Sequence, residues 1–251
     1  MTDDHTPFEA DLHVDEVRYS RYERGYLLLA SAFVVVLVLT NIVGVKLFVS
    51  PINGAALTTG ILTYPLTFLF TDLVSEIYGK RRADFMVLVG FLMSCLMLGI
   101  VQIALHVPAH PYWVPPEGAF FETADGYQHA YNSVFAVNGI LLFGSMLAYA
   151  VAQLTDNKLY HFWKRVTKGR HLWLRNNAST WVSQLLDTVI VNSILFYIGF
   201  QWDFAQGAAV MLTIYWHKLI LAAIDTPLIY LGVFLLKKWI DGDPHAKKAT
   251  A

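Results

Sequence analysis

The stretch FMVLVGFLMSCLMLGIVQIALH, residues 85–106, contains no Asp, Glu, Lys or Arg. The hydrocarbon core of a bilayer is about 30 Å thick and needs about 20 mainly apolar residues in a helix, so this stretch predicts a transmembrane helix. Five more stretches predict spans, over residues 26–48, 57–78, 134–158, 180–200 and 207–236. The composition, 56% hydrophobic and 15% charged, is unlike that of a soluble domain. We therefore expect an all-α integral membrane protein with six transmembrane helices.

The positions of Lys and Arg predict the orientation, because these residues stay on the cytoplasmic side in short loops. Of 18 such residues, 16 fall on one side of the predicted bundle and none in the three opposite loops. They are Arg18, Arg21, Arg24, Lys80, Arg81, Arg82, Lys158, Lys164, Arg165, Lys168, Arg170, Arg175, Lys237, Lys238, Lys247 and Lys248. We expect a multi-pass protein of the inner (plasma) membrane with both termini in the cytoplasm.

This topology divides the chain into three parts. Residues 1–24 form an acidic and polar cytoplasmic tail, expected to be disordered or to lie on the surface, without the apolar core of a signal peptide. Residues 25–240 form the membrane domain, and residues 241–251 form a second cytoplasmic tail. The longest outer loop, residues 107–130, is rich in proline and aromatic residues and is interpreted as an interfacial cap, with a lid over an entrance as the alternative.

Charged residues fall inside or at the edge of the predicted spans. They are Lys46, Asp72, Glu76, Asp156, Asp187, Lys218 and Asp225. A charge at the bilayer centre costs at least about 2.5 kcal/mol, so such residues normally face a cavity or a partner. These residues include five carboxylates but only two ammonium groups. Some of the acids must therefore be protonated, paired with loop cations, solvated, or available to a proton or cation. The alternative is a set of salt bridges that only fixes the bundle.

Amide and carboxylate side chains alternate along two of the spans. Gln153 lies three residues before Asp156, and Gln184 lies three residues before Asp187, so each pair shares one helix face. Together an amide and a carboxylate offer both hydrogen-bond donors and acceptors. That combination suits a heterocycle with several polar edges, such as a purine or a pterin. A guanine-like edge, with N–H beside NH2, matches one carboxylate.

Prolines interrupt the second and sixth predicted spans. Pro65 and Pro227 each remove a helical hydrogen bond, which in a membrane is tolerated beside a cavity or a neighbouring helix. Broken helices near the midplane are frequent at transporter binding sites, although a packing kink is the alternative. Tyr64, Trp216 and Tyr230 are candidate stacking faces for a flat ligand.

The two halves of the chain contain three predicted spans each. An internal 3+3 repeat would therefore be inverted in the membrane, and the second span would correspond to the fifth. Both of these spans carry an acid, Asp72 in one and Asp187 in the other. Such repeats place the substrate at their interface.

Several stretches resemble the queuosine precursor transporters, also described as vitamin-uptake-type proteins. The resemblance rests on Thr40-Asn41 with Lys46, on YPLTFLFTDLVSEIYGKRRA (64–83), on YAVAQLTDNKLY (149–160), on ASTWVSQLLDTVIVNSILFYIGF (178–200) and on HKLILAAIDTPLIYLG (217–232). It implies uptake of 7-cyano- or 7-aminomethyl-7-deazaguanine, by alternating access around a site between the helices. No nucleic-acid partner is expected, and whether the chain forms a homodimer stays open.

The resemblance and the buried polar pattern together give the candidate residues. Those expected to bind substrate are Asn41, Tyr64, Asp72, Gln184, Asp187, Trp216 and Lys218. Those expected in ion pairs, gating or coupling are Lys46, Glu76, Gln153, Asp156 and Asp225. We expect no metal and no cofactor, since Cys95 is the only cysteine and excludes a thiolate cluster.

Three other functions compete with a transporter. A substrate-binding subunit, for a vitamin or another nucleobase, would need a separate ATPase, because the chain has no G-x-x-x-x-G-K-[ST] loop. An intramembrane enzyme is not expected, because H-E-x-x-H and G-x-S-x-G are both absent from the sequence. A structural membrane protein without a ligand would tolerate Asp187→Asn with no change in uptake.

Overall fold

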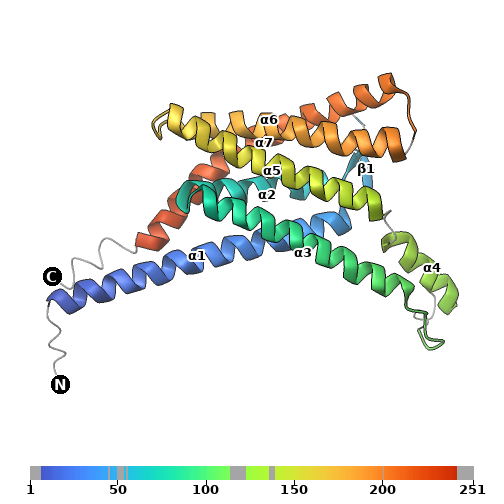
Figure 1. The fold of residues 1–251 in the computed structure, drawn as a ribbon, viewed down its shortest axis with the longest axis horizontal. Helices are drawn as coiled ribbons and strands as arrows, with labels where there is room; N and C mark the ends of the chain where they lie inside the picture. The colour runs from blue at the N-terminus through green and yellow to red at the C-terminus, as the bar shows by residue number, and fades with distance from the viewer. Residues whose placement is uncertain are drawn as a thin grey trace.

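The computed structural model describes residues 7–44, 46–49, 54, 56–113, 123–135, 139–199 and 201–241. Within these residues the chain forms seven α-helices, one π-helical segment and one short hairpin (Figure 1). The helices are α1 Pro7–Val43, α2 Gly60–Ile77, α3 Lys80–His106, α4 Ala124–Phe135, α5 Gly139–Val166, α6 Leu172–Ser193 and α7 Phe204–Asp241, with η1 Ile194–Gly199 continuing α6.

Six of the helices coincide with the six apolar stretches of the sequence, which confirms the helical fold class. Four helical stretches are long and apolar enough to cross a bilayer, and this makes the chain a multi-pass membrane protein. They are Glu16–Val43, Lys80–His106, Leu172–Ile198 and Phe204–Asp241. The other two predicted spans correspond to α2 and α5, which carry a large share of the buried polar side chains. Figure 1 shows α2 in the middle of the bundle, where it contacts α1, α3, α5 and α7.

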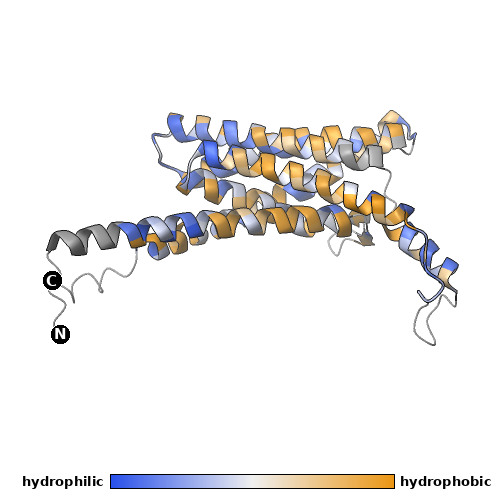
Figure 2. Cartoon of the chain, turned by 60° about the horizontal axis from the view of Figure 1, so that its bottom comes forward, coloured by the Kyte–Doolittle hydropathy of each residue, from blue (hydrophilic) through white to orange (hydrophobic). Residues whose placement is uncertain are grey.

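Polar and charged residues gather at one end of the bundle (Figure 2). At this end Arg18 near the start of α1 pairs with Asp241 at the end of α7, at 2.8 Å. Arg82 in the first turn of α3 pairs with Glu23 of α1, at 2.7 Å. The α5–α6 loop lies at the same end (Figure 1). The loops that contain most of the Lys and Arg residues are therefore together in space.

The first predicted span extends too far toward its C-terminal end. α1 ends at Val43, and a hairpin follows in which β1 Leu47–Val49 pairs antiparallel with β2 Ala56–Thr58. Leu47 lies opposite Thr58 in its register. Lys46 therefore does not end a helix: it is exposed and lies between α1 and β1.

The fourth predicted span begins too early, because residues 134 and 135 belong to α4. α4 covers the last part of the predicted outer cap, residues 107–130, and extends beyond it to Phe135. The Thr123 hydroxyl accepts a hydrogen bond from the Gly126 amide at 3.1 Å, which satisfies a free N–H of the first turn. Trp113 packs on Tyr127, with ring centroids 4.8 Å apart.

Residues 7–24, expected to belong to the tail, continue the helix of the first span. α1 runs without a break from Pro7 to Val43, so this part of the tail is helical rather than disordered. Its membrane part packs closely on α3, where Gly90 leaves room for the ring of Phe33. Phe33 and Leu37 are buried in this contact and belong to the main apolar core.

Candidate functional site

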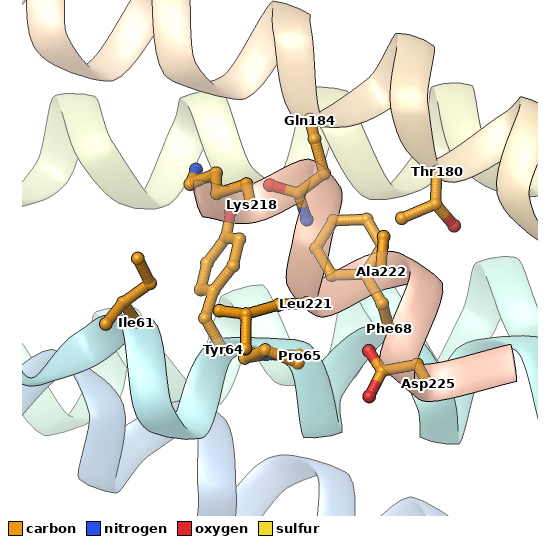
Figure 3. Close-up of a pocket in the computed structure, with 10 residues that line it drawn as sticks. All are labelled: Ile61, Tyr64, Pro65, Phe68, Thr180, Gln184, Lys218, Leu221, Ala222 and Asp225. Carbon is orange, nitrogen blue, oxygen red and sulfur yellow. The ribbon is translucent and has the colours of Figure 1, made fainter. Parts of the chain in front are cut away.

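A small pocket lies where α2, α6 and α7 meet (Figure 3). Its lining combines an aromatic ring, an amide, a hydroxyl, a lysine and a carboxylate with apolar side chains. The lining residues are Ile61, Tyr64, Pro65, Phe68, Thr180, Gln184, Lys218, Leu221, Ala222 and Asp225. The cavity volume is about 20 Å³, which is room for about one water molecule. The pocket is therefore too small to hold a heterocycle.

An ion pair closes one side of the pocket. Lys218 Nζ of α7 lies 2.6 Å from Asp187 Oδ2 of α6. The same ammonium lies 4.8 Å from the centre of the Tyr64 ring of α2, within the range of a cation–π contact. The side chains of Asp187 and Lys218 are 4% and 14% exposed, so the pair is almost completely removed from solvent. Three helices thus meet at one buried cation.

Several polar atoms lie around this cation. Gln184 Oε1 and Asp187 Oδ1 are buried and have no hydrogen-bond partner among the residues that the structure describes, and the Tyr64 hydroxyl lies within hydrogen-bonding reach of Asp187. A buried polar group without a partner costs about 1–3 kcal/mol, so these atoms indicate a missing ligand or water. Figure 3 shows the Gln184 amide and the Lys218 side chain on the same side of the pocket as the Tyr64 hydroxyl. A ligand held here would meet acceptors, a cation and an aromatic face.

Two buried carboxyl groups lie side by side between α2 and α5. Asp72 is 2% exposed and Asp156 is 0% exposed, and their carboxyl groups are within hydrogen-bonding reach of each other. Asp156 Oδ1 accepts a hydrogen bond from the Ser183 hydroxyl of α6 at 2.9 Å. Asp72 Oδ1 and Asp156 Oδ2 have no partner. Asp72 does not line the pocket itself.

The Gln153 amide of α5 forms hydrogen bonds with Thr71 of α2 and with Tyr149 of α5. Gln153 Oε1 accepts a hydrogen bond from the Thr71 hydroxyl of α2 at 3.2 Å, and Gln153 Nε2 donates to Tyr149 OH at 2.6 Å. The Tyr149 ring in turn packs edge-on against Tyr64, with centroids 5.2 Å apart. Gln153 therefore supports the aromatic wall of the pocket rather than lining it.

A third polar group joins α2, α5 and α6 at the polar end of the bundle. Glu76 pairs with Arg175 at 2.7 Å and with Lys164 at 2.9 Å. The Tyr160 hydroxyl donates to Glu76 Oε2 at 3.0 Å, and Arg175 Nε donates to the same hydroxyl at 3.2 Å. Glu76 therefore has two cationic partners and one hydroxyl donor.

Three of the predicted site residues lie away from the pocket. Asn41 of α1 donates to the Ser94 hydroxyl of α3 at 3.2 Å, so it joins those two helices. Lys46 is exposed beyond the end of α1. Trp216 is 62% exposed, so it is directed to the surroundings of the bundle rather than to the stacking position predicted for it. Lys218 and Asp225, which are seven residues apart on α7, both line the pocket.

Sequence reasoning missed two residues that shape the site. Arg175 was placed in a loop, but α6 begins at Leu172 and buries the Arg175 side chain to 3% exposure against Glu76. The sequence signal for Arg175 was Glu76, since a buried carboxylate needs a cation. Thr180 lines the pocket, and its hydroxyl lies within hydrogen-bonding reach of Asp156. It shares a polar face with Gln184, four residues later, and this spacing was readable from the sequence.

The pocket would have to widen before a flat heterocycle could enter it. The present cavity holds no more than about one water. Pro65 interrupts α2 and lines the pocket, and Pro227 interrupts α7 just beyond Asp225. Proline removes one helical hydrogen bond and so provides a position where a helix bends. Bending at these positions would open the pocket.

Comparison with known proteins agrees with the resemblance seen in the sequence. The family model described as "Putative vitamin uptake transporter" matches residues 58–232, which include α2, α6 and most of α7. A curated protein of Bacillus subtilis (strain 168), named "Probable queuosine precursor transporter", is 29% identical over 195 residues, which cover 77% of each chain. No solved structure gives a significant match.

Proposed function

This chain belongs to the "Putative vitamin uptake transporter" family, and from that premise we propose that its cargo is a 7-deazaguanine precursor of queuosine. The 7-cyano compound, the 7-aminomethyl compound or both would be taken up. The name of the Bacillus relative supports this cargo, as do the motifs quoted from the sequence. The chain is a membrane transporter and, on this proposal, does no chemistry on its substrate.

One observation carries the choice of cargo. Gln184 Oε1 and Asp187 Oδ1 are buried beside one small pocket and have no hydrogen-bond partner among the described residues, and the Tyr64 hydroxyl lies next to Asp187. A guanine-like edge presents N–H beside NH2, so a carboxylate can accept both hydrogen bonds. Gln184 would bind another edge of the base through its amide. The Tyr64 ring would lie against the base, and Lys218 would be free to donate to a carbonyl oxygen once Asp187 binds the substrate.

We place six spans in the inner membrane, with both termini in the cytoplasm. The gathering of Lys and Arg at one end of the bundle supports this orientation. The buried polar faces of α2 and α5 support spans that cross between other helices rather than in lipid. Alternating access would then open the pocket first to the outside and afterwards to the cytoplasm, around the bends at Pro65 and Pro227.

The test is uptake in a host that cannot make its own queuosine precursor. Expression of this chain should restore queuosine to the tRNA when 7-cyano-7-deazaguanine is supplied in the medium. Asp187→Asn should abolish that uptake while the protein still inserts in the membrane. Asp125→Asn, at an exposed acid of α4, is the matched control and should transport normally. Unchanged uptake by Asp187→Asn would refute the proposed site.

The family description leaves a vitamin as the alternative cargo. Purified protein in liposomes separates the two, since excess unlabelled vitamin would compete with labelled deazaguanine only if it shares the pocket. The same liposomes test the need for an ATPase partner. Exchange of labelled for unlabelled deazaguanine by the chain alone would show that no second subunit is required.

A further inference from the structure

The pair formed by Asp72 and Asp156 is not explained by substrate binding. Both carboxyl groups are buried, at 2% and 0% exposure, and neither lines the pocket. Neither forms an ion pair with any residue that the structure describes. Two cations of neighbouring helices, Arg175 and Lys164, both pair with Glu76 instead. The acids therefore face each other without compensation.

The surroundings of the pair are polar but add no positive charge. Ser183 donates to Asp156 Oδ1 at 2.9 Å, and the Ser179 and Thr180 hydroxyls lie within hydrogen-bonding reach of Asp156. The ionisable groups that face the pair are Glu76 of α2, Tyr149 and Tyr160 of α5 and Asp225 of α7. Four acids, counting the pair itself, and two tyrosines therefore interact here.

One proton resolves this arrangement. Two adjacent buried carboxylates repel each other strongly, whereas a singly protonated pair forms a short, charge-assisted hydrogen bond. The proton would be shared by the two carboxyl groups, each of which has one buried oxygen, Asp72 Oδ1 and Asp156 Oδ2, without an assigned hydrogen bond among the described residues. Two interacting acids of this kind titrate as a unit. The geometry therefore defines a site for a single exchangeable proton.

We propose that Asp72 and Asp156 hold the proton that drives uptake, one proton entering with each substrate molecule. This inference rests on the proposed transport function and adds its energy source. The pair would take up a proton from the outer side and release it to the cytoplasm. Bacterial membranes maintain an inward proton gradient, and proton relays in transporters are built from such intramembrane acids.

Two residues connect the pair with the pocket. Thr180 lines the pocket and lies beside Asp156. Asp225 also lines the pocket and interacts electrostatically with Asp72. A substrate that forms a hydrogen bond with the Thr180 hydroxyl or the Asp225 carboxylate would change the electrostatic potential at Asp72 and Asp156. Substrate binding and protonation would thereby favour each other, which is the requirement for coupling.

The first experiment measures protons with the purified full-length chain in liposomes. Sodium-free potassium buffers are used, with valinomycin to hold the membrane potential at zero and a pH dye inside. Adding 7-cyano-7-deazaguanine should acidify the lumen by one proton per molecule taken up. With the outside one pH unit more acidic, substrate should accumulate about tenfold, because one unit is worth about 1.4 kcal/mol. Entry of substrate without acidification overturns the inference.

The second experiment uses Asp156→Asn, which keeps the shape of the side chain. Its amide oxygen still accepts from Ser183, and its NH2 donates to Asp72, so the variant imitates the protonated pair permanently. Exchange of internal for external substrate should persist, but accumulation driven by the pH gradient should disappear. Asp125→Asn, again the matched control, should retain both activities.

The outcomes separate the two proposals. Absence of exchange in the wild-type protein refutes the transport function, and with it this inference. Exchange combined with gradient-driven accumulation in Asp156→Asn refutes only the proton site. Accumulation that follows a sodium gradient and ignores pH also refutes it, because the carboxyl and hydroxyl oxygens would then bind Na⁺. If Asp156→Asn cannot be purified, the dye measurement on the wild type decides alone.

Discussion

Arg175 Nη2 lies 2.7 Å from Glu76 Oε1 and joins the first turns of α6 to the last turn of α2. The second partner of Glu76, Lys164, lies at 2.9 Å but is 30% exposed, compared with 3% for Arg175. Arg175 also donates to the carbonyl of Gly169 in the α5–α6 loop, at 2.8 Å. Arg175 is therefore the buried cation of this network, and Lys164 is the more exposed one.

We predict that Arg175→Met destabilises the protein far more than Lys164→Met. Removing the buried cation leaves a carboxylate partly unpaired and costs about 3–5 kcal/mol, whereas a partly exposed pair is worth about 1 kcal/mol or less. Thermal unfolding of the purified protein in detergent measures the difference. Adding Glu76→Gln to Arg175→Met should recover part of the loss. Equal melting of the two single variants would contradict the assignment.

The Asp187–Lys218 pair leads to a prediction that separates stability from transport. Lys218→Met leaves Asp187, which is 4% exposed, as a buried charge without a cation, so both stability and uptake should fall. Adding Asp187→Asn removes that charge and should restore the melting temperature. Uptake should stay absent, because the groups that would recognise the base are gone. A double variant that transports would show that the pair is only structural.

The cost of burying charge made part of the site predictable. Asp187 and Lys218 were recognised because a charge in a span needs a partner, and they form that pair. Trp216 and Lys46 were also predicted as site residues but lie away from the pocket, and the reason is different. Hydropathy shows that a residue lies in or near a span but not which face points inward, and it does not register a helix end when a short hairpin of apolar residues follows.

The fold was predictable to the level of helices, not of their ends. A window of apolar residues gives each span, but the polar face of a helix can continue past it, as α6 does with Arg175. The short helix α4 was missed because its aromatic residues lie in a stretch of low hydropathy. The i, i+4 spacing of Tyr127, Tyr131 and Phe135 was its signal. The Asp72–Asp156 contact joins distant segments, so only the packing of α2 against α5 reveals it.

Two glycines of α3 provide a matched test of the helix packing. A Cβ at Gly90 would lie 2.5 Å from a ring carbon of Phe33 in α1, whereas a Cβ at Gly99 would meet nothing within 4 Å. Gly90→Ala should therefore force α1 and α3 apart and cost about 1–3 kcal/mol. Gly99→Ala should be neutral or slightly stabilising, since alanine favours helix. Thermal unfolding in detergent compares them, and an equal response would mean that α1 does not pack on α3 as described.

The proposed orientation predicts which loops can be labelled from outside the cell. With Cys95→Ser as background, Tyr112→Cys places a thiol between α3 and α4, at a position 89% exposed. Arg170→Cys places one in the exposed α5–α6 loop, at the opposite end of the bundle. A membrane-impermeant maleimide added to intact cells should label only the first variant. The second should react only after the membrane is opened, because its loop carries the basic residues that remain in the cytoplasm.

The reverse labelling pattern would show that the orientation is the opposite of the proposed one. Labelling of both positions in intact cells would place both loops outside and contradict a complete crossing between them.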